Sequence, residues 1–258
     1  ASDVYKRQPQ GQMETDYQKM LRSLYITLQQ QINELENGQV EQAEYFTMWV
    51  HQIKTPIAAL RLLLAEEEDE RSQEMWEELF SIEQYVEMAL QFSRLSAKST
   101  DFVIGEVSLD KVVREAIHKY ARLFVRKKIK MELSSIDTQV LTDEKWLEFV
   151  IEQILSNAIK YTAGGTISIY QKINVTDEKK EVKELIIEDT GIGIAPEDLP
   201  RIFEKGYTGY NGHADKRSTG IGLYLCRKIM RKLSHEITIE SEIGVGTKVH
   251  LEMRSRDK

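Results

Sequence analysis

The first quarter of the chain repeats apolar residues with the period of a helix. From Tyr17 to Ala65 they recur at steps of four and three, and Gly and Pro are nearly absent. A stripe this narrow is buried only against other helices. The clearest series is Phe46, Val50, Ile53, Ile57, Leu60 and Leu64. An earlier series, Tyr17, Leu21, Leu24, Leu28 and Leu35, is out of phase with it across Gly38, so a register change or a kink is expected there.

A second apolar stripe begins after an acidic run at 66–70. Its members are Met75, Leu79, Ile82, Val86, Ala89 and Ser93. Two helical stripes joined by a short polar segment predict a helical hairpin. Two hairpins paired as a four-helix bundle would bury both stripes, which favours a homodimer. The alternative is one hairpin packed against the second domain of its own chain.

Beyond a polar linker at 96–105, helical and strand patterns alternate. Ser108 is a good N-cap for a helix to about residue 125, and Thr142 or Asp143 for a helix to about residue 161. Strands are expected at 166–171, 184–188, 236–240 and 247–253, with a charged turn at 177–180. This order indicates an α+β layer with its helices on one face of the sheet. Residues 107–255 are therefore expected to form a second domain.

Composition narrows the possible functions. The net charge is −7 and the two signs are interleaved, so nucleic acid is not an expected partner. The single cysteine, Cys226, has no internal partner, which fits a reducing compartment. The longest apolar runs, such as 57–65, are too short to cross a bilayer. Residues 1–12 are polar and contain Pro9 and Gly11, and we expect them to lie outside the fold.

One histidine stands out on the first helix, within the segment WVHQIKTP. If Val50 and Ile53 lie in the apolar seam, His51 lies on the flank, open to solvent. An exposed histidine is usually only a surface residue. Here, however, Pro56 follows five residues later and is expected to bend the helix one turn beyond the imidazole. That local distortion favours a functional role for His51.

Two glycine segments are suited to a ligand. The segment DTGIGI at 189–194 follows an isoleucine-rich strand, so its backbone can approach a ligand and Asp189 can accept a hydrogen bond from an exocyclic amine. The segment STGIGL at 218–223 opens a helix, whose first N–H groups suit phosphate. Its spacing matches neither the P-loop nor the dinucleotide fingerprint. Each segment alone could be an ordinary turn.

Polar residues also follow one face of the helix that precedes the sheet. Gln153, Asn157 and Lys160 are spaced by four and three residues. The face therefore presents amide oxygens suited to a hard cation and an ammonium suited to phosphate. A solvated polar face is the simpler interpretation of this helix taken by itself.

Taken in chain order, these segments resemble the boxes of sensor histidine kinases. His51 lies in the H box, Asn157 in the N box, 189–194 is the G1 box, Arg201 to Glu204 the F box, and 218–223 the G2 box. The resemblance covers residues 45–253. The segments WVHQIKTP and 207–212 further resemble the small intramembrane-sensing kinases of Firmicutes that work with peptide-antibiotic transporters.

The resemblance implies a multidomain α and α+β protein. The expected order is a coiled-coil linker helix at 13–44, a dimerisation and histidine phosphotransfer domain at 45–96, a linker at 97–106, an ATP-binding domain at 107–255 and a tail at 256–258. The hairpin would form the dimeric four-helix bundle. The second domain would be an α/β sandwich of the GHKL ATPase type, shared with gyrase, Hsp90 and MutL.

The resemblance also implies roles for individual residues. Asn157 matches the magnesium ligand, and Gln153, at the position of a second magnesium contact, departs from the family, which commonly has Asn there. Lys160 matches a phosphate contact, Tyr161 a residue beside the nucleotide, and Asp189 the carboxylate that binds the adenine amine. Further residues at the nucleotide would be Gly191, Gly193, Thr219, Gly220, Gly222, Leu223 and Thr247. The segment 205–218 would be the lid over the nucleotide.

The implied reaction is ATP-dependent phosphorylation of His51 and transfer to an aspartate of a response regulator receiver domain, with ATP and Mg²⁺ as cofactors. Thr55 matches the residue that positions water for dephosphorylation of the regulator. Gln52 departs from the family, which usually has Glu or Asp there, and its amide brings no negative charge to the imidazole. A dimeric scaffold that binds ATP with little kinase activity is therefore one alternative. A gyrase- or Hsp90-type ATPase is another, although it has no use for a histidine on a bent helix.

The expected partners are a second copy of the chain, the receiver domain and no nucleic acid. By the same resemblance the chain is the cytoplasmic fragment of a bacterial inner-membrane protein, and a membrane transporter would be contacted through membrane segments that are missing here.

Overall fold

The computed structural model describes residues 11–65, 69–96, 102–175, 181–209 and 219–253. The chain divides into two compact units, 1–100 and 101–258. Among the described residues, no helix combines the length and the hydrophobicity that a membrane crossing requires.

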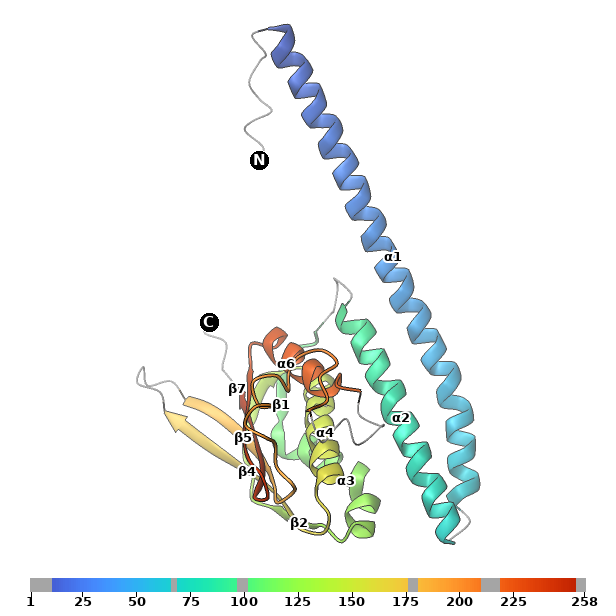
Figure 1. Ribbon diagram of the computed structural model, residues 1–258, viewed down its shortest axis with the longest axis vertical. Coiled ribbons are helices and arrows are strands. Elements are labelled where there is room, and N and C mark those ends of the chain that lie inside the picture. The colour runs from blue at the N-terminus through green and yellow to red at the C-terminus, as the bar shows by residue number, and fades with distance from the viewer. Residues whose placement is uncertain (1–10, 66–68, 97–101, 176–180, 210–218, 254–258) are drawn as a thin grey trace. The chain divides into compact units, whose positions relative to one another are not determined.

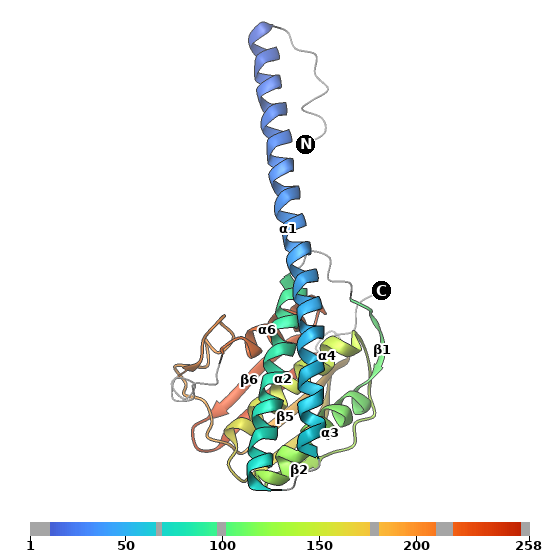
Figure 2. The same cartoon turned by 90° about the vertical axis from the view of Figure 1, so that its right-hand side faces the viewer.

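The first unit is a hairpin of two helices, α1 (Gln12–Ala65) and α2 (Glu70–Ser96), which lie side by side (Figures 1 and 2). The helix α1 runs without interruption through Gly38, where a register change or a kink was expected, and through Pro56. Because proline has no N–H, the carbonyl of Gln52 loses its intrahelical partner there. At the start of α2, the carboxylate of Asp69 accepts a hydrogen bond from the Ser72 N–H at 2.7 Å.

An apolar seam joins the two helices. Val50 and Ile57 of α1 are buried together with Leu79, Val86 and Leu90 of α2, and Ile53 and Leu64 pack against this cluster. The predicted stripe on α1 is confirmed at these positions. Three other members of the predicted stripes, Leu60, Met75 and Ile82, are 50%, 42% and 47% exposed in the single chain, and Leu90 extends the seam on α2.

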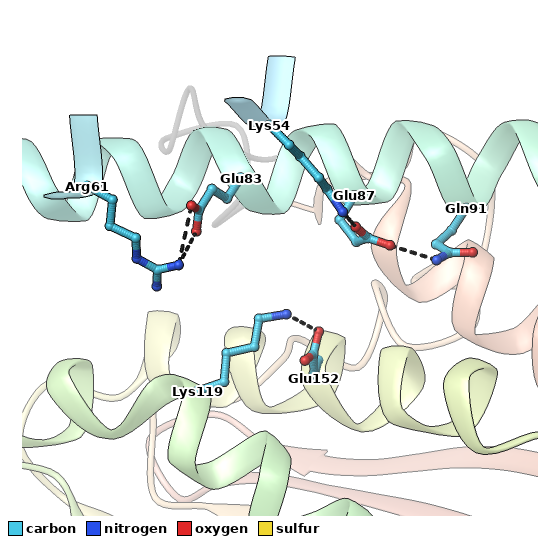
Figure 3. A network of polar contacts seen from close by, with 7 residues as sticks. All are labelled: Lys54, Arg61, Glu83, Glu87, Gln91, Lys119 and Glu152. Atoms are coloured by element: carbon cyan, nitrogen blue, oxygen red, sulfur yellow. Dashed lines mark hydrogen bonds and ion pairs between the residues drawn. The ribbon is translucent and has the colours of Figure 1, made fainter. Parts of the chain in front are cut away.

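Ion pairs line one edge of this seam. Lys54 Nζ lies 2.8 Å from the carboxylate of Glu87, which also accepts a hydrogen bond from Gln91 at 2.7 Å (Figure 3). Arg61 lies 3.4 Å from Glu83. Each pair is partly exposed, so each stabilises the hairpin by less than about 1 kcal/mol. Their main effect is to fix the register in which the helices run antiparallel.

The opposite edge of the seam is apolar and uncovered. Counted at about 100° per residue, five exposed apolar side chains of the two helices fall on the side of the seam away from the ion pairs. They are Trp49, Leu60 and Leu63 of α1 and Met75 and Ile82 of α2. A soluble protein seldom leaves such a contiguous face in water, so this face is suited to a further helical surface.

The second unit is an α+β layer, as predicted. Its five-stranded sheet has the order β2-β4-β5-β7-β6, in which only β2 and β4 pair in parallel. The strands are β2 (Lys130–Leu133), β4 (Thr166–Val175), β5 (Glu181–Asp189), β6 (Glu236–Glu242) and β7 (Gly246–Met253). The helices α3 (Leu109–Arg126), α4 (Glu144–Tyr161) and α6 (Gly222–Lys232) lie on one face of this sheet (Figure 1).

Three strands escaped the sequence analysis. Besides β2, they are β1 (Gly105–Ser108) and β3 (Gln139–Thr142), which pair with each other in a separate two-stranded sheet. Each has four residues, which is too few for a period-two pattern to be distinguished from a loop. The predicted turn at 177–180 lies outside the described residues.

The two predicted helix starts are present. The Ser108 hydroxyl accepts a hydrogen bond from the Lys111 N–H at 3.4 Å, and Asp143, rather than Thr142, caps α4 through the Trp146 N–H at 3.1 Å. The other carboxylate oxygen of Asp143 accepts a hydrogen bond from the Val103 N–H at 2.7 Å. Asp143 therefore anchors the incoming chain to the helix that carries Asn157.

Candidate functional site

A buried carboxylate marks the end of the central strand β5. Asp189 is 8% exposed, and its Oδ1 accepts a hydrogen bond from the Gly191 N–H at 2.8 Å. Burial raises the pKa of Asp189, while the backbone N–H groups of Gly191 and Thr247 lower it. The carboxylate is thus desolvated, yet held by two donors that favour its charged form.

The backbone of Gly191 packs closely against this carboxylate and leaves no room for a side chain. A Cβ atom there would lie 2.5 Å from the Tyr161 carbonyl, 2.7 Å from Asp189 Oδ1 and 3.0 Å from the Thr162 hydroxyl. That hydroxyl is buried and has no hydrogen-bond partner within the described ranges. A carboxylate and an unsatisfied hydroxyl around one glycine suit a ligand that presents several hydrogen-bonding groups, as a purine edge does. Thr162 was not among the predicted residues.

The loop after Asp189 is tied to two other parts of the unit. The Ile192 N–H donates to the Tyr161 carbonyl at 3.2 Å, and the Ile192 carbonyl accepts a hydrogen bond from the Gly244 N–H at 2.9 Å. The Ser241 hydroxyl accepts a hydrogen bond from the Ile194 N–H at 2.9 Å. It also donates to the Gly246 carbonyl at 2.7 Å. The loop is therefore held by the end of α4 on one side and by the β6–β7 turn on the other.

The two remaining sequence candidates near this loop behave differently. The Thr247 hydroxyl lies 2.9 Å from the Ser241 hydroxyl, so it belongs to the same set of contacts. Gly193 has a φ of +71°, and a Cβ atom there would collide with the Glu242 carbonyl. Glycine is required at position 193 for both reasons.

Replacing Gly193 with alanine is expected to lower the free energy of unfolding by about 3 kcal/mol or more, because strain at positive φ adds to overpacking. Gly164→Ala is a matched control, since Gly164 has a φ of +66° and no atom within 4 Å of its would-be Cβ. That variant should lose only about 1 kcal/mol. Urea denaturation measures both. Equal losses would show that the collision with Glu242 is unimportant.

The predicted polar face belongs to α4, whose last residue, Tyr161, has its carbonyl beside Gly191. Asn157 and Lys160 are partly exposed, whereas Gln153 is buried at 5% exposure. Lys160 Nζ lies 5.1 Å from the centre of the Tyr161 ring. Of the two amides, Asn157 is therefore the more accessible to a cation.

The second glycine segment leads into α6, as predicted. Gly220 has a φ of +64°, and its carbonyl accepts a hydrogen bond from the Gly206 N–H at 2.9 Å. The Thr219 hydroxyl accepts a hydrogen bond from the Ile221 N–H at 3.4 Å, and Gly222 and the partly exposed Leu223 begin the helix. Of the predicted lid, only 205–209 lie within the described residues, and Ser218 lies outside them.

His51 belongs to the other unit and is exposed, as predicted. Gln52 and Thr55 are exposed beside it. The Thr55 hydroxyl donates to the His51 carbonyl at 3.3 Å, which fixes the hydroxyl one turn along the helix from the imidazole. Lys54, three residues beyond His51, is held by Glu87.

Comparison with known proteins identifies the family. Residues 142–257 match the histidine kinase-, DNA gyrase B- and HSP90-like ATPases. Sensor histidine kinase YxdK of Bacillus subtilis strain 168 is 36% identical over 90% of this chain and 71% of its own length. The chain belongs to the sensor histidine kinases. Within this family, sensor protein BceS of the same organism is 36% identical over 77% of the chain, and sensor protein kinase GraS of Staphylococcus aureus strain MRSA252 is 36% identical over 80%. The chain spans 58% of the length of each of these two relatives.

Solved histidine kinases share the fold. Full-length ShkA in complex with AMPPNP aligns with 83% of this chain and 47% of its own length, at a TM-score of 0.57 and 21% identity. Acinetobacter baumannii histidine kinase AdeS aligns with 80% of this chain and 98% of its own, at a TM-score of 0.55 and 21% identity. At such low identity, these two structures show only that the chain shares their fold.

Proposed function

We propose that the second unit binds ATP with Mg²⁺ and that the γ-phosphoryl group is transferred to His51. The observation that carries this proposal is the pair of buried polar groups that flank the Gly191 backbone, the Asp189 carboxylate and the unsatisfied Thr162 hydroxyl. The family match to histidine kinase-like ATPases supports the choice of ATP as the ligand.

The residues present fit such a ligand. The Asp189 carboxylate would accept a hydrogen bond from the adenine amine, and the Thr162 hydroxyl would pair with the same edge of the base. The accessible Asn157 would hold Mg²⁺, with Gln153 behind it, and Lys160 would neutralise phosphate charge. When bound, Mg²⁺ supplies charge neutralisation at the phosphoryl oxygens.

The chemistry at His51 follows from its side chain. The lone pair of one ring nitrogen attacks the γ-phosphorus, an N–P bond forms, and the bond from phosphorus to the bridging oxygen breaks so that ADP leaves. The other ring N–H then gives its proton to solvent. The N–P bond is labile, so the group can pass to an aspartate carboxylate of a response regulator receiver domain. In this proposal the exposed hydroxyl of Thr55, one turn from His51, would orient the water that later hydrolyses that acyl phosphate.

The test is the chemical nature of the phosphate on the protein. After incubation with ATP labelled at the γ-position, the chain should carry label that acid removes and alkali does not, and ATP labelled at the α-position should give none. An ATPase of the gyrase type would instead release free phosphate with no label on the protein. A scaffold would bind ATP without labelling the protein and without releasing phosphate. Either the result expected of an ATPase or the result expected of a scaffold would refute the proposal.

Changing Gln52 to Glu is expected to speed autophosphorylation. A carboxylate next to the imidazole adds negative charge that stabilises the developing imidazolium, which an amide does not. General acid–base catalysis typically contributes about 10²- to 10⁴-fold, but Gln52 is exposed and a charge there is screened by solvent, so we expect a gain of only about 3- to 10-fold. Initial rates of labelling measure it, with Gln52→Asn as the uncharged control. Equal rates in the Glu and Asn variants would contradict the prediction.

We further propose that the hairpins of two copies pair. The uncovered apolar face formed by Trp49, Leu60, Leu63, Met75 and Ile82 is the surface that such a four-helix bundle would bury. The relatives BceS and GraS carry the name of sensor proteins. By resemblance to their class, this region would work in the cytoplasm and would be attached to membrane segments. A membrane transporter would be contacted through those segments.

A further inference from the structure

Three lysines on α3 contact α4 at a constant interval. Lys111, Lys119 and Lys127 are eight residues apart. Lys111 Nζ lies 2.8 Å from Glu144 and Lys119 Nζ lies 2.6 Å from Glu152, a separation of 33 residues in both cases. The ladder formed by these three lysines shows that α3 and α4 run parallel and in register. Figure 3 shows its middle rung, Lys119 with Glu152.

The third rung has a different acceptor. Lys127 Nζ donates to the Ile159 carbonyl at 2.8 Å and approaches the Lys160 carbonyl at 3.4 Å, again 32 and 33 residues away. These are carbonyls of the last turn of α4, which no later N–H of the helix can satisfy. The partial negative charge at the helix end takes the place of a carboxylate, and a cation there is stabilising.

The turn that follows α3 determines the position of Lys127. Lys127 is the C-cap residue of α3, and Lys128 after it has a φ of +53°, a left-handed conformation unusual for a residue other than glycine. The Ile129 N–H then bonds to the Phe124 carbonyl at 3.0 Å and Ile129 is buried. The chain thus turns away at 128, while the Lys127 ammonium binds the end of α4.

The last turn of α4 is also where the candidate nucleotide site begins. Lys160 and Tyr161 lie in it, and the next carbonyl, that of Tyr161, accepts the Ile192 N–H of the loop after Asp189. Three successive carbonyls at the end of α4 are therefore satisfied by two sources, the Lys127 ammonium and the glycine loop. Movement of this turn would shift Lys160, Tyr161 and the loop together.

We propose that Lys127 is a positioning residue for nucleotide binding. Its ammonium binds the carbonyls of Ile159 and Lys160, and it acts by holding the end of α4 to which the 189–194 loop is bonded. This inference rests on the proposed ATP site. The other two rungs, which lie nearer the start and the middle of α4, hold the same pair of helices together without contacting the loop.

The experiment measures MgATP affinity by isothermal titration with the whole chain, together with thermal unfolding. Lys127→Met is expected to weaken MgATP binding by about 5- to 10-fold, whereas Lys127→Arg, which keeps the charge and the donors, should restore most of it. If the methionine variant does not fold, Lys127→Gln serves the same comparison.

The other rungs supply the matched controls. Lys119→Met leaves the Glu152 side chain, 7% exposed, without its cation, so it should lower the melting temperature more than Lys127→Met while changing MgATP affinity by less than about 2-fold. Lys111→Met, at an exposed rung, should change neither. Affinity losses that follow melting temperature across the three variants would overturn the positioning role.

The remaining outcomes are distinguishable. If the unmodified chain binds no MgATP, the proposed function fails and this inference with it. If it binds MgATP and Asp189→Asn abolishes binding while Lys127→Met does not weaken it, the nucleotide site stands and only the role of Lys127 is refuted.

Discussion

Replacing His51 with alanine is expected to abolish ATP-dependent labelling of the chain and to leave MgATP affinity and thermal stability unchanged. The imidazole is the only proposed acceptor, so its loss removes the nucleophile rather than slowing the reaction. His51 is exposed on α1 and makes no contribution to the apolar seam, so truncation should not disturb the hairpin. Gel autoradiography of the labelled protein gives the first result, and titration calorimetry gives the second.

His118→Ala is the matched control, because His118 is also an exposed helical histidine, on α3. It should retain full labelling. Label that survives in the His51 variant would move the acceptor elsewhere. Label lost together with MgATP affinity would show that the substitution acts on the nucleotide site and not on the acceptor.

The second large effect concerns Asp189. Changing it to asparagine is expected to weaken MgATP binding by about 10- to 100-fold, because a charged acceptor of the adenine amine is exchanged for a neutral group that can turn its own donors towards the base. Labelling of His51 should fall in proportion at subsaturating ATP. Titration with MgATP measures the affinity, and MgGTP, which presents a carbonyl in place of the amine, tests the direction of the hydrogen bond.

The same variant should not be less stable, and the reason is the sign of the pKa shift. Burial raises the pKa of Asp189 above its ordinary value of 3.8, so folding disfavours the carboxylate. The contribution of this group to stability is complete below pH 3.8 and is lost as the pH rises through the higher folded pKa. Asparagine does not titrate, so the stability of the unmodified chain relative to Asp189→Asn should decline from pH 3 to pH 7. A relative stability that rises with pH would contradict this account.

Local patterns predicted the elements and their caps well. The seam at Val50 and Ile57, the cap at Ser108 and the glycine segments all depend on residues within a few positions of one another, where helix period and turn preference operate. The boundaries of α4 and the α+β class of the second unit followed from the same signals. The short strands β1 to β3 did not, because four residues carry too little periodicity.

What the sequence could not supply are contacts between distant positions. Ser241 holds Ile194 across 47 residues, and Lys127 reaches Ile159 across 32. A serine in a strand and a lysine at a helix end carry no local sign of these acceptors. Thr162 was likewise passed over, because its importance lies in the hydroxyl that packing leaves unsatisfied beside Gly191.

Three consecutive residues of α1 face three different surroundings. Trp49 faces the uncovered apolar edge, Val50 is buried in the seam, and His51 points to the flank on the side of Lys54, since successive residues are turned by about 100°. A second copy that covers the apolar edge would therefore leave both histidines on the outside of the bundle. A tighter dimer would therefore leave the imidazole as accessible as before. Natural selection could change the stability of the dimer and the rate of phosphorylation at His51 independently.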